Sequence, residues 1–134
     1  MLRFARYAWA SPVTMLGLAF AGPCALGGAR VRVVDGVVEC SGGPVARLPG
    51  RRFAAITLGH VVLARDDAAA DACRVHEHAH VRQYECFGPL MLPLYVASSG
   101  WAALRGGRAY FDNAFERHAR DAERRALLLA HRGE

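Results

Sequence analysis

Residues 66–89 read DDAAADACRVHEHAHVRQYECFGP, and this stretch decides how the fold is interpreted. The part from Ala68 to Tyr84 predicts an α-helix, because it is rich in Ala and contains no Gly or Pro. Asp66 and Asp67 stand before it as candidate N-caps, and Gly88-Pro89 follows as a stop signal. The sequence therefore predicts one well-bounded helix in the middle of the chain.

This helix carries the pattern H-E-x-x-H at His76, Glu77 and His80. Two histidines four positions apart share one face of a helix and can bind one metal ion. Glu77 lies beside that face, where a carboxylate can take a proton from a metal-bound water. The pattern predicts a Zn²⁺ site with Glu77 as the general base, and we expect His78 to point away into solvent. The alternative is a surface helix that is rich in histidine for no functional reason.

A catalytic zinc ion takes three protein ligands, so a third ligand is required. A second helix is predicted from about Asn113 to His131, and Glu116 lies in its first turn. Ala119 offers a small surface for close packing against another helix. Glu116 is the preferred third ligand and Glu123, two turns later, is the reserve. Weaker candidates in the same stretch are Asp112, His118 and Asp121.

The combination of His76-Glu77-x-x-His80 with a downstream Glu116-x-x-Ala119 resembles the gluzincin branch of the zincin metallopeptidases. The resemblance implies a zincin-like α+β fold, a bound Zn²⁺, and a third ligand from a glutamate on a second helix. It also implies zinc-dependent hydrolysis of peptide bonds in a peptide or protein substrate.

The chain also resembles a group of small bacterial proteins over a little under half of its length. The matching segments are H-E-x-x-H-V-R-Q-Y-E at 76–85, G-P-L-x-x-P-x-Y at 88–95 and D-N-A-F-E at 112–116. Ala114 stands where that group has Pro. Arg120 stands where many gluzincins have an Asp that orients a ligand histidine, and Asp121, one residue away, is the alternative for that role. The group implies no particular substrate.

Peptide hydrolysis also needs a donor that stabilises the oxyanion. Tyr110 and His118 are the main candidates because they are close in sequence to Glu116. Arg117 and His60 are further candidates, although a half-exposed strand histidine is the simpler interpretation of His60.

A small antiparallel sheet is predicted from about Arg30 to Ala64. Arg30–Val34 and Val37–Cys40 flank Asp35-Gly36, which indicates a hairpin with a type I′ turn. Phe53–Ala64 is rich in β-branched residues and predicts one or two more strands. In a zincin the strand edge beside the catalytic helix binds substrate backbone, so this segment is the expected substrate edge.

Two stretches without charge raise the question of a membrane. Trp9–Gly27 follows two arginines, and Phe87–Leu104 lies between Glu85 and Arg105. Both are close to the minimum length for spanning a bilayer and both contain proline. Three interpretations stay open: attachment to the bacterial inner membrane, a cleaved signal in an exported protein, or buried helices of a cytoplasmic protein.

Composition sets the remaining limits. Residues 1–134 are enough for one domain, and the net charge is +5 with all 17 basic residues being Arg. The arginines are scattered and not interleaved with aromatic residues, which argues against a nucleic-acid partner and leaves an anionic lipid surface as the better one. The four cysteines lack C-x-x-C spacing and are expected to be small apolar filler.

Three functional hypotheses follow from the sequence. The first is a zinc peptidase associated with a membrane. The second is a zinc-binding protein without catalytic activity. The third is a membrane-associated structural protein in which the H-E-x-x-H pattern is a coincidence.

Overall fold

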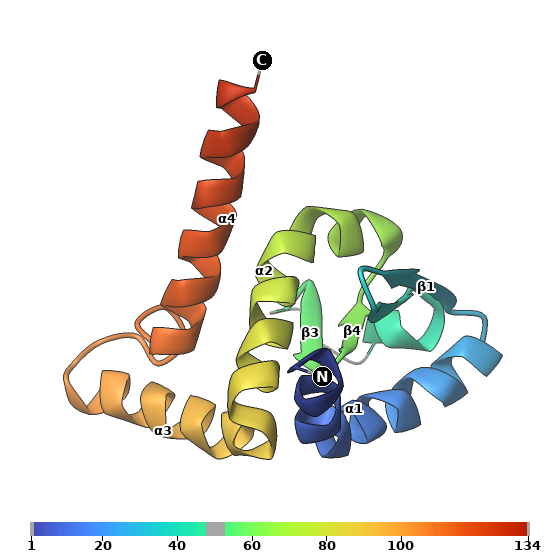
Figure 1. The fold of residues 1–134 in the computed structure, drawn as a ribbon, viewed down its shortest axis with the longest axis horizontal. Helices are drawn as coiled ribbons and strands as arrows, with labels where there is room; N and C mark the ends of the chain where they lie inside the picture. Colours follow the sequence, from blue (N-terminus) through green and yellow to red (C-terminus); the bar gives the residue numbers. More distant parts are fainter. Residues whose placement is uncertain (1, 48–52, 134) are drawn as a thin grey trace.

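The computed structural model describes residues 2–47 and 53–133. The first half contains α1 (Leu2–Leu26), β1 (Arg30–Val34), β2 (Val37–Ser41), the short 3-10 helix η1 (Gly43–Arg47), β3 (Ala55–Leu58) and β4 (Val61–Ala64). The second half contains α2 (Asp67–Phe87), the 3-10 turn η2 (Gly88–Leu90), α3 (Met91–Leu104) and α4 (Ala114–Arg132). The architecture is α+β, with an apolar N-terminal helix, as expected (Figure 1).

The four strands form one sheet in the order β1-β2-β4-β3. The β1–β2 hairpin is confirmed: Asp35 and Gly36 have φ angles of 52° and 80°, as a type I′ turn requires. The expectation of a wholly antiparallel sheet is wrong, because β2 and β4 run parallel. β4 is buried along its whole length, whereas β3 is buried at alternate residues. The more apolar strand of the β3–β4 pair therefore takes the inner place beside β2.

Helix α2 is the predicted central helix, a few residues longer than expected. Its N-cap is Asp66, whose Oδ1 accepts a hydrogen bond of 2.7 Å from the amide of Ala69. It ends at Phe87 because Gly88 adopts a φ of 55° and the chain turns into η2. The bend separates α2 from α3, so the uncharged stretch 87–104 forms a helix of its own.

Helix α1 packs against the rest of the protein along its length. Its buried face has residues spaced three or four apart, namely Ala10, Val13, Gly17, Ala21 and Cys24. A Cβ on Gly17 would lie 2.7 Å from Cβ of Val61, so only glycine permits this approach to β4. Nearer the N-terminus of α1, the Trp9 ring covers Gly88. One face of α1 is thus built into the fold, and its opposite face is exposed.

Two helical stretches, Leu2–Leu26 and Asp67–Leu104, are long and apolar enough to cross a membrane. A signal sequence or the core helix of a soluble protein passes the same test. Figure 1 shows α1 and α3 along the lower edge of the molecule, with α4 extending away from them toward the C-terminus.

Helix α4 begins as predicted, with Asn113 as its N-cap: Asn113 Oδ1 accepts a 2.9 Å hydrogen bond from the amide of Phe115. It packs against α2, and Ala119 at this interface is completely buried. The small side chain lets the two helices approach closely, which brings the first turn of α4 beside the middle of α2.

Candidate metal centre

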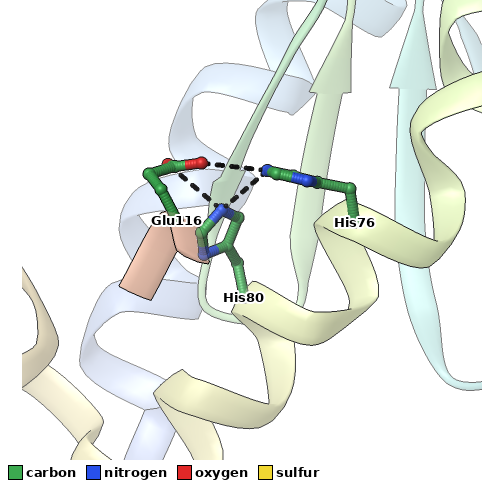
Figure 2. A group of neighbouring side chains, drawn as sticks. All are labelled: His76, His80 and Glu116. Atoms are coloured by element: carbon green, nitrogen blue, oxygen red, sulfur yellow. Dashed lines mark hydrogen bonds and ion pairs between the residues drawn. The ribbon is translucent and has the colours of Figure 1, made fainter. Parts of the chain in front are cut away.

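Three side chains from two helices converge on one point (Figure 2). His76 and His80 project from α2, and Glu116 projects from the first turn of α4. Nε2 of His76 lies 3.1 Å from Oε2 of Glu116 and 3.2 Å from Nε2 of His80. Nε2 of His80 lies 3.3 Å from Oε1 of Glu116. The sequence prediction that these three residues come together is therefore confirmed.

The spacing of these atoms suits a small tetrahedral ion. Zinc with ligand bonds of about 2.0–2.1 Å holds neighbouring ligand atoms about 3.3 Å apart. The three distances in the cluster are 3.1, 3.2 and 3.3 Å. Two imidazoles and one carboxylate are also a typical ligand set for a catalytic metal, so these residues can hold an ion with a fourth position left open.

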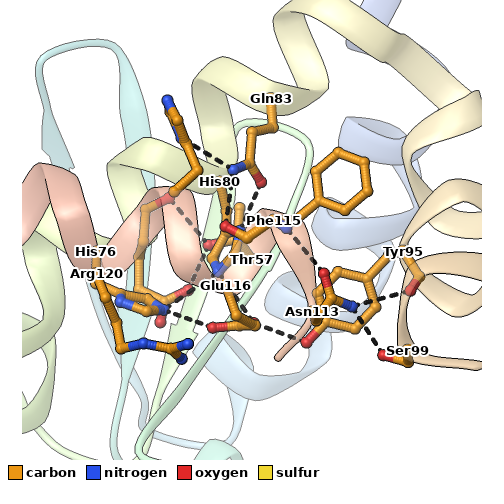
Figure 3. A network of polar contacts seen from close by, with 12 residues as sticks. Thr57, His76, His80, Gln83, Tyr95, Ser99, Asn113, Phe115, Glu116 and Arg120 are labelled. Carbon is orange, nitrogen blue, oxygen red and sulfur yellow. Dashed lines mark hydrogen bonds and ion pairs between the residues drawn. The ribbon is translucent and has the colours of Figure 1, made fainter. Parts of the chain in front are cut away.

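The hydrogen-bond network around Gln83 fixes the ring orientation of His80 (Figure 3). The Gln83 amide nitrogen donates to the backbone oxygen of Phe115 at 3.0 Å, which places its oxygen toward His80. Nδ1 of His80, 2.8 Å from that oxygen, must therefore carry the proton. In the neutral ring Nε2 is then a bare lone pair that points into the cluster, as a metal ligand requires.

The charges of the cluster are strongly coupled. Burial opposes the charged form of Glu116, but hydrogen bonds with His76, His80 and Tyr95 hold the pKa of its carboxyl well below the ordinary value. Burial likewise opposes a charged His80, but its contacts with Glu116 and Gln83 leave the pKa of His80 raised. The carboxylate therefore stays ionised and favours the charged form of His80.

The second nitrogen of His76 faces the reserve candidate, Glu123. Nδ1 of His76 lies 3.8 Å from Oε2 of Glu123, on the side of the ring away from Glu116. Arg120, which replaces the orienting Asp of many gluzincins, turns instead to the backbone oxygen of Phe111. Glu123 thus stands where a carboxylate can orient the ring of His76, while Glu116 is the carboxylate inside the cluster.

Tyr95 is a contact that the sequence interpretation missed. Its hydroxyl donates to Oε1 of Glu116 at 2.7 Å. The backbone oxygen of Tyr95 accepts a 3.0 Å hydrogen bond from the side-chain amide of Asn113, the cap of α4. One chain of bonds therefore links α3, the start of α4 and the ligand carboxylate. The sequence signal that could have indicated Tyr95 is its place at the end of the segment 88–95.

Glu77 is held on the other side of the cluster by strand β3. Thr57 Oγ1 donates to Oε2 of Glu77 at 2.6 Å, and both residues are buried. Among the described residues, β3 pairs only with β4, so its other edge has no partner strand. The carboxylate of Glu77 therefore lies between the ligand pair and a free strand edge.

A pocket of about 700 Å³ opens at this place. Its walls come from β3, α2 and α3, and Glu77 lies in it together with the three residues of the cluster. Tyr110, one of the candidate oxyanion donors, also lines it. Burial and the nearby Glu116 raise the pKa of Tyr110, so its hydroxyl keeps its proton and can act as a donor.

The other candidate donors lie elsewhere. Nδ1 of His118 contacts the amide of Gln83 at 3.2 Å, behind His80, and neither His118 nor Arg117 is part of the pocket wall. His60 is not a half-exposed strand residue: it is buried, stacks on Tyr7 and contacts Glu85 at 3.2 Å. These placements leave Tyr110 as the predicted donor that reaches the pocket.

His78 is not solvated, contrary to expectation. Its side chain is 12% exposed, and Nε2 lies 3.5 Å from Oε1 of the buried Glu39 on β2. The helix face opposite the cluster packs on the sheet, which removes the solvent that a surface helix would have offered. The four cysteines are free. Cys24 and Cys40 belong to the core, as expected of apolar filler, whereas Cys86 is exposed and does not fit that expectation.

No protein-family model, curated protein or solved structure matches this chain.

Proposed function

We propose that this protein is a zinc-dependent peptidase that works at a membrane surface. One observation carries the proposal: three ligand-type atoms converge at tetrahedral spacing in a pocket that also holds a buried glutamate. His76, His80 and Glu116 are the proposed ligands. The same ligand set suits other divalent ions, and zinc is proposed because two histidines and one carboxylate with an open position is its common catalytic set.

Each residue of the site has a role in peptide hydrolysis. A bound zinc ion lowers the pKa of its water and polarises the substrate carbonyl. Glu77 accepts the proton of the attacking water and delivers it to the leaving amine. Thr57 holds the Glu77 carboxylate in place by the 2.6 Å hydrogen bond. The Tyr110 hydroxyl keeps its proton and donates a hydrogen bond to the oxyanion that develops on the substrate.

The free edge of β3 is the proposed place for the substrate backbone. An extended peptide can add to an exposed strand edge through main-chain hydrogen bonds. Ala55, Ile56, Thr57 and Leu58 all line the pocket. A peptide on this edge lies beside Glu77, because Thr57 contacts Glu77 directly. The strand would thus fix the position of the scissile bond relative to the metal.

Membrane association is proposed from the outer faces of α1 and α3. Each helix contacts the protein on one side and exposes large apolar side chains on the other. On α1 these are Leu2, Phe4, Trp9, Met15, Leu16, Leu18 and Phe20, and on α3 they are Leu92, Leu94, Val96, Trp101 and Leu104. α1 is packed on the fold from Trp9 to Gly17, so we propose that it lies at the surface of the bilayer rather than crossing it.

Metal analysis combined with peptide hydrolysis tests the proposed activity. Purified full-length protein should contain about one zinc per chain by elemental analysis. Glu77→Gln should keep that zinc and lose hydrolysis of a mixed peptide library by about 10²-fold or more. His80→Ala should lose the zinc itself. His78→Ala is the matched control on the same helix and should keep both zinc and activity.

Two outcomes would contradict the proposal. Equal hydrolysis by the wild type and Glu77→Gln would exclude this mechanism. Zinc bound by His76 and His80 without hydrolysis of any library peptide would favour a metal-binding protein without catalysis.

A further inference from the structure

We propose that the pocket receives its substrate from the lipid surface, and that the substrate is a peptide segment with bulky apolar side chains beside the scissile bond. This inference rests on the proposed peptidase function and adds its substrate class. Three features carry it: the lining of the pocket, the character of its rim, and the position of α3.

Among the residues that the structure describes, the pocket wall has charge only at the site itself. Of its described lining residues, the ionisable groups other than tyrosine are His76, Glu77, His80 and Glu116. The rest of the wall is mainly apolar. A charged substrate side chain beside the scissile bond would lose its hydration without finding a partner there, which is costly. Leucine, phenylalanine or similar side chains would instead bury apolar surface against this wall.

The rim of the pocket is apolar as well. The lining residues that are also exposed to solvent are Phe53, Leu92, Pro93, Val96, Ala97 and Tyr110. Val96 is 69% exposed, and together with its neighbours on the rim it forms a contiguous apolar patch rather than a single exposed side chain. An apolar segment would therefore contact apolar surface from outside the pocket to its floor.

Helix α3 joins this rim to the surface that we assign to lipid. Leu92 and Val96 line the pocket on one flank of α3, and Leu104 and Trp101 are exposed about 120° and 180° around the helix from Leu92, so apolar side chains continue from the pocket side around the solvent-exposed part of the helix. Its 14 residues make a helix of about 21 Å, shorter than the hydrocarbon thickness of a bilayer, which is about 30 Å. α3 fits a position in the plane of the interface, with the mouth of the pocket beside it.

The charges around α3 favour an anionic bilayer as the partner. Arg105 lies over the Trp101 ring at 4.6 Å and Arg108 lies over the Phe111 ring at 4.5 Å. Residues 86–111 include no Asp or Glu. Aromatic rings paired with arginines at the end of an apolar helix are typical of the membrane–water interface. Arg3 and Arg6 at the start of α1 give the second apolar helix the same character.

The experiment compares matched substrates with and without lipid. Internally quenched peptides of one polar sequence carry a central Leu-Leu or Ser-Ser pair, each with or without an N-terminal myristoyl chain. The zinc-loaded full-length protein is assayed alone, with phosphatidylcholine vesicles, and with vesicles containing about one third phosphatidylglycerol. The Leu-Leu peptide should be cleaved about tenfold faster than the Ser-Ser peptide. The anionic vesicles should raise cleavage of its myristoylated form by about another tenfold.

Two double variants separate membrane contact from general loss of apolar surface. Trp101→Ser with Leu104→Ser should lose most of the gain from vesicles and most of the vesicle binding in flotation. Leu127→Ser with Leu128→Ser removes two large side chains that are also more than half exposed from the distal part of α4, and this variant should keep both the gain from vesicles and the vesicle binding. Zinc content and thermal unfolding, measured for each variant, identify any loss caused by misfolding.

The failures of the two proposals are distinguishable. Zinc-dependent cleavage that is equal for Leu-Leu and Ser-Ser peptides, or that gains nothing from anionic vesicles, overturns this inference and leaves the peptidase function in place. Absence of cleavage of every peptide by the zinc-loaded protein overturns the peptidase function and this inference with it.

Discussion

On each side of α2 a buried glutamate lies next to histidine, but the two glutamates have different partners and different roles. On the sheet side, Glu39 is 1% exposed and lies 3.5 Å from His78. On the side of α4, Glu116 is 3% exposed and contacts His76 and His80. The residue types are the same, and the difference lies in what neutralises each carboxylate.

Glu39 is saturated by arginine. Nε and Nη2 of Arg74 bind its two oxygens at 2.8 and 2.9 Å, and Arg32 approaches at 3.4 Å. Glu116 has no guanidinium among its described partners; its contacts are two imidazoles and the hydroxyl of Tyr95. A carboxylate that is already neutralised by guanidinium groups gains little from binding a metal ion. A carboxylate whose contacts are two imidazoles and a hydroxyl, beside an open pocket, can exchange the imidazole protons for a metal ion.

Exchanging each glutamate for glutamine should separate the two sides and has the largest expected effects. Glu116→Gln should leave the apo-protein folded. It should weaken zinc binding by more than about 100-fold, because loss of a residue that only contacts a ligand typically costs about 10–100-fold. Glu39→Gln should keep the zinc affinity but lower the free energy of unfolding by about 2 kcal/mol, because a neutral amide replaces the buried carboxylate that binds Arg74 and Arg32, which among the described residues keep only Asp71 as a carboxylate partner. Zinc titration and urea unfolding measure the two quantities. If both variants lose zinc and stability together, the two sides of α2 are not distinct.

The contact between Glu123 and His76 allows a smaller test on the metal side alone. Glu123→Gln should weaken zinc binding by about tenfold, because the ring of His76 loses a carboxylate that orients it and raises its basicity. Asp121→Asn removes the same charge from an exposed position of α4 and is the control. A zinc competition assay with a chromogenic chelator compares them. Equal loss in the two variants would mean that general charge, and not orientation of His76, matters.

The pH dependence of stability should show the smallest effect, and on the sheet side. Hydrogen bonding by Arg74 outweighs burial and holds the pKa of Glu39 below its ordinary 4.5. A lowered pKa means that this contribution to stability is complete above about pH 4.5 and is lost as the pH falls through the folded-state pKa. Thermal unfolding of the apo-protein from about pH 6 to 3 should therefore fall more steeply for the wild type than for Glu39→Gln. Parallel curves would contradict the pairing.

Local signals in the sequence were sufficient for much of the structure. The N-cap at Asp66, the turn at Asp35-Gly36 and the cap at Asn113 each act within a few residues, so the helices and the hairpin could be placed. His76 and His80 share a face by helix geometry alone. The choice of Glu116 followed from its place in the first turn of a second helix and from the resemblance to the gluzincins.

Long-range pairings could not be predicted in this way. The parallel contact of β2 and β4 depends on which strand of the β3–β4 pair is buried between neighbours, and no turn residue specifies that. The burial of Glu39 depends on Arg74, which is distant in sequence. The role of Gln83 depends on the backbone carbonyl of Phe115 on another helix, so no local sequence signal predicts it.

The close packing of α2 against α4 at Ala119 determines how α4 is held on the rest of the protein. His76 and Glu116 are 40 residues apart, and an ion held by both would be a cross-link between α2 and α4. Closing a loop of that length in the unfolded chain corresponds to about 4 kcal/mol of chain entropy. The outer part of α4, with Leu127, Leu128 and Leu129 exposed, has little packing of its own to secure it. Metal binding would then hold this helix on the rest of the protein, so chelation should make α4 (Ala114–Arg132) the first part of the chain that a protease can cut.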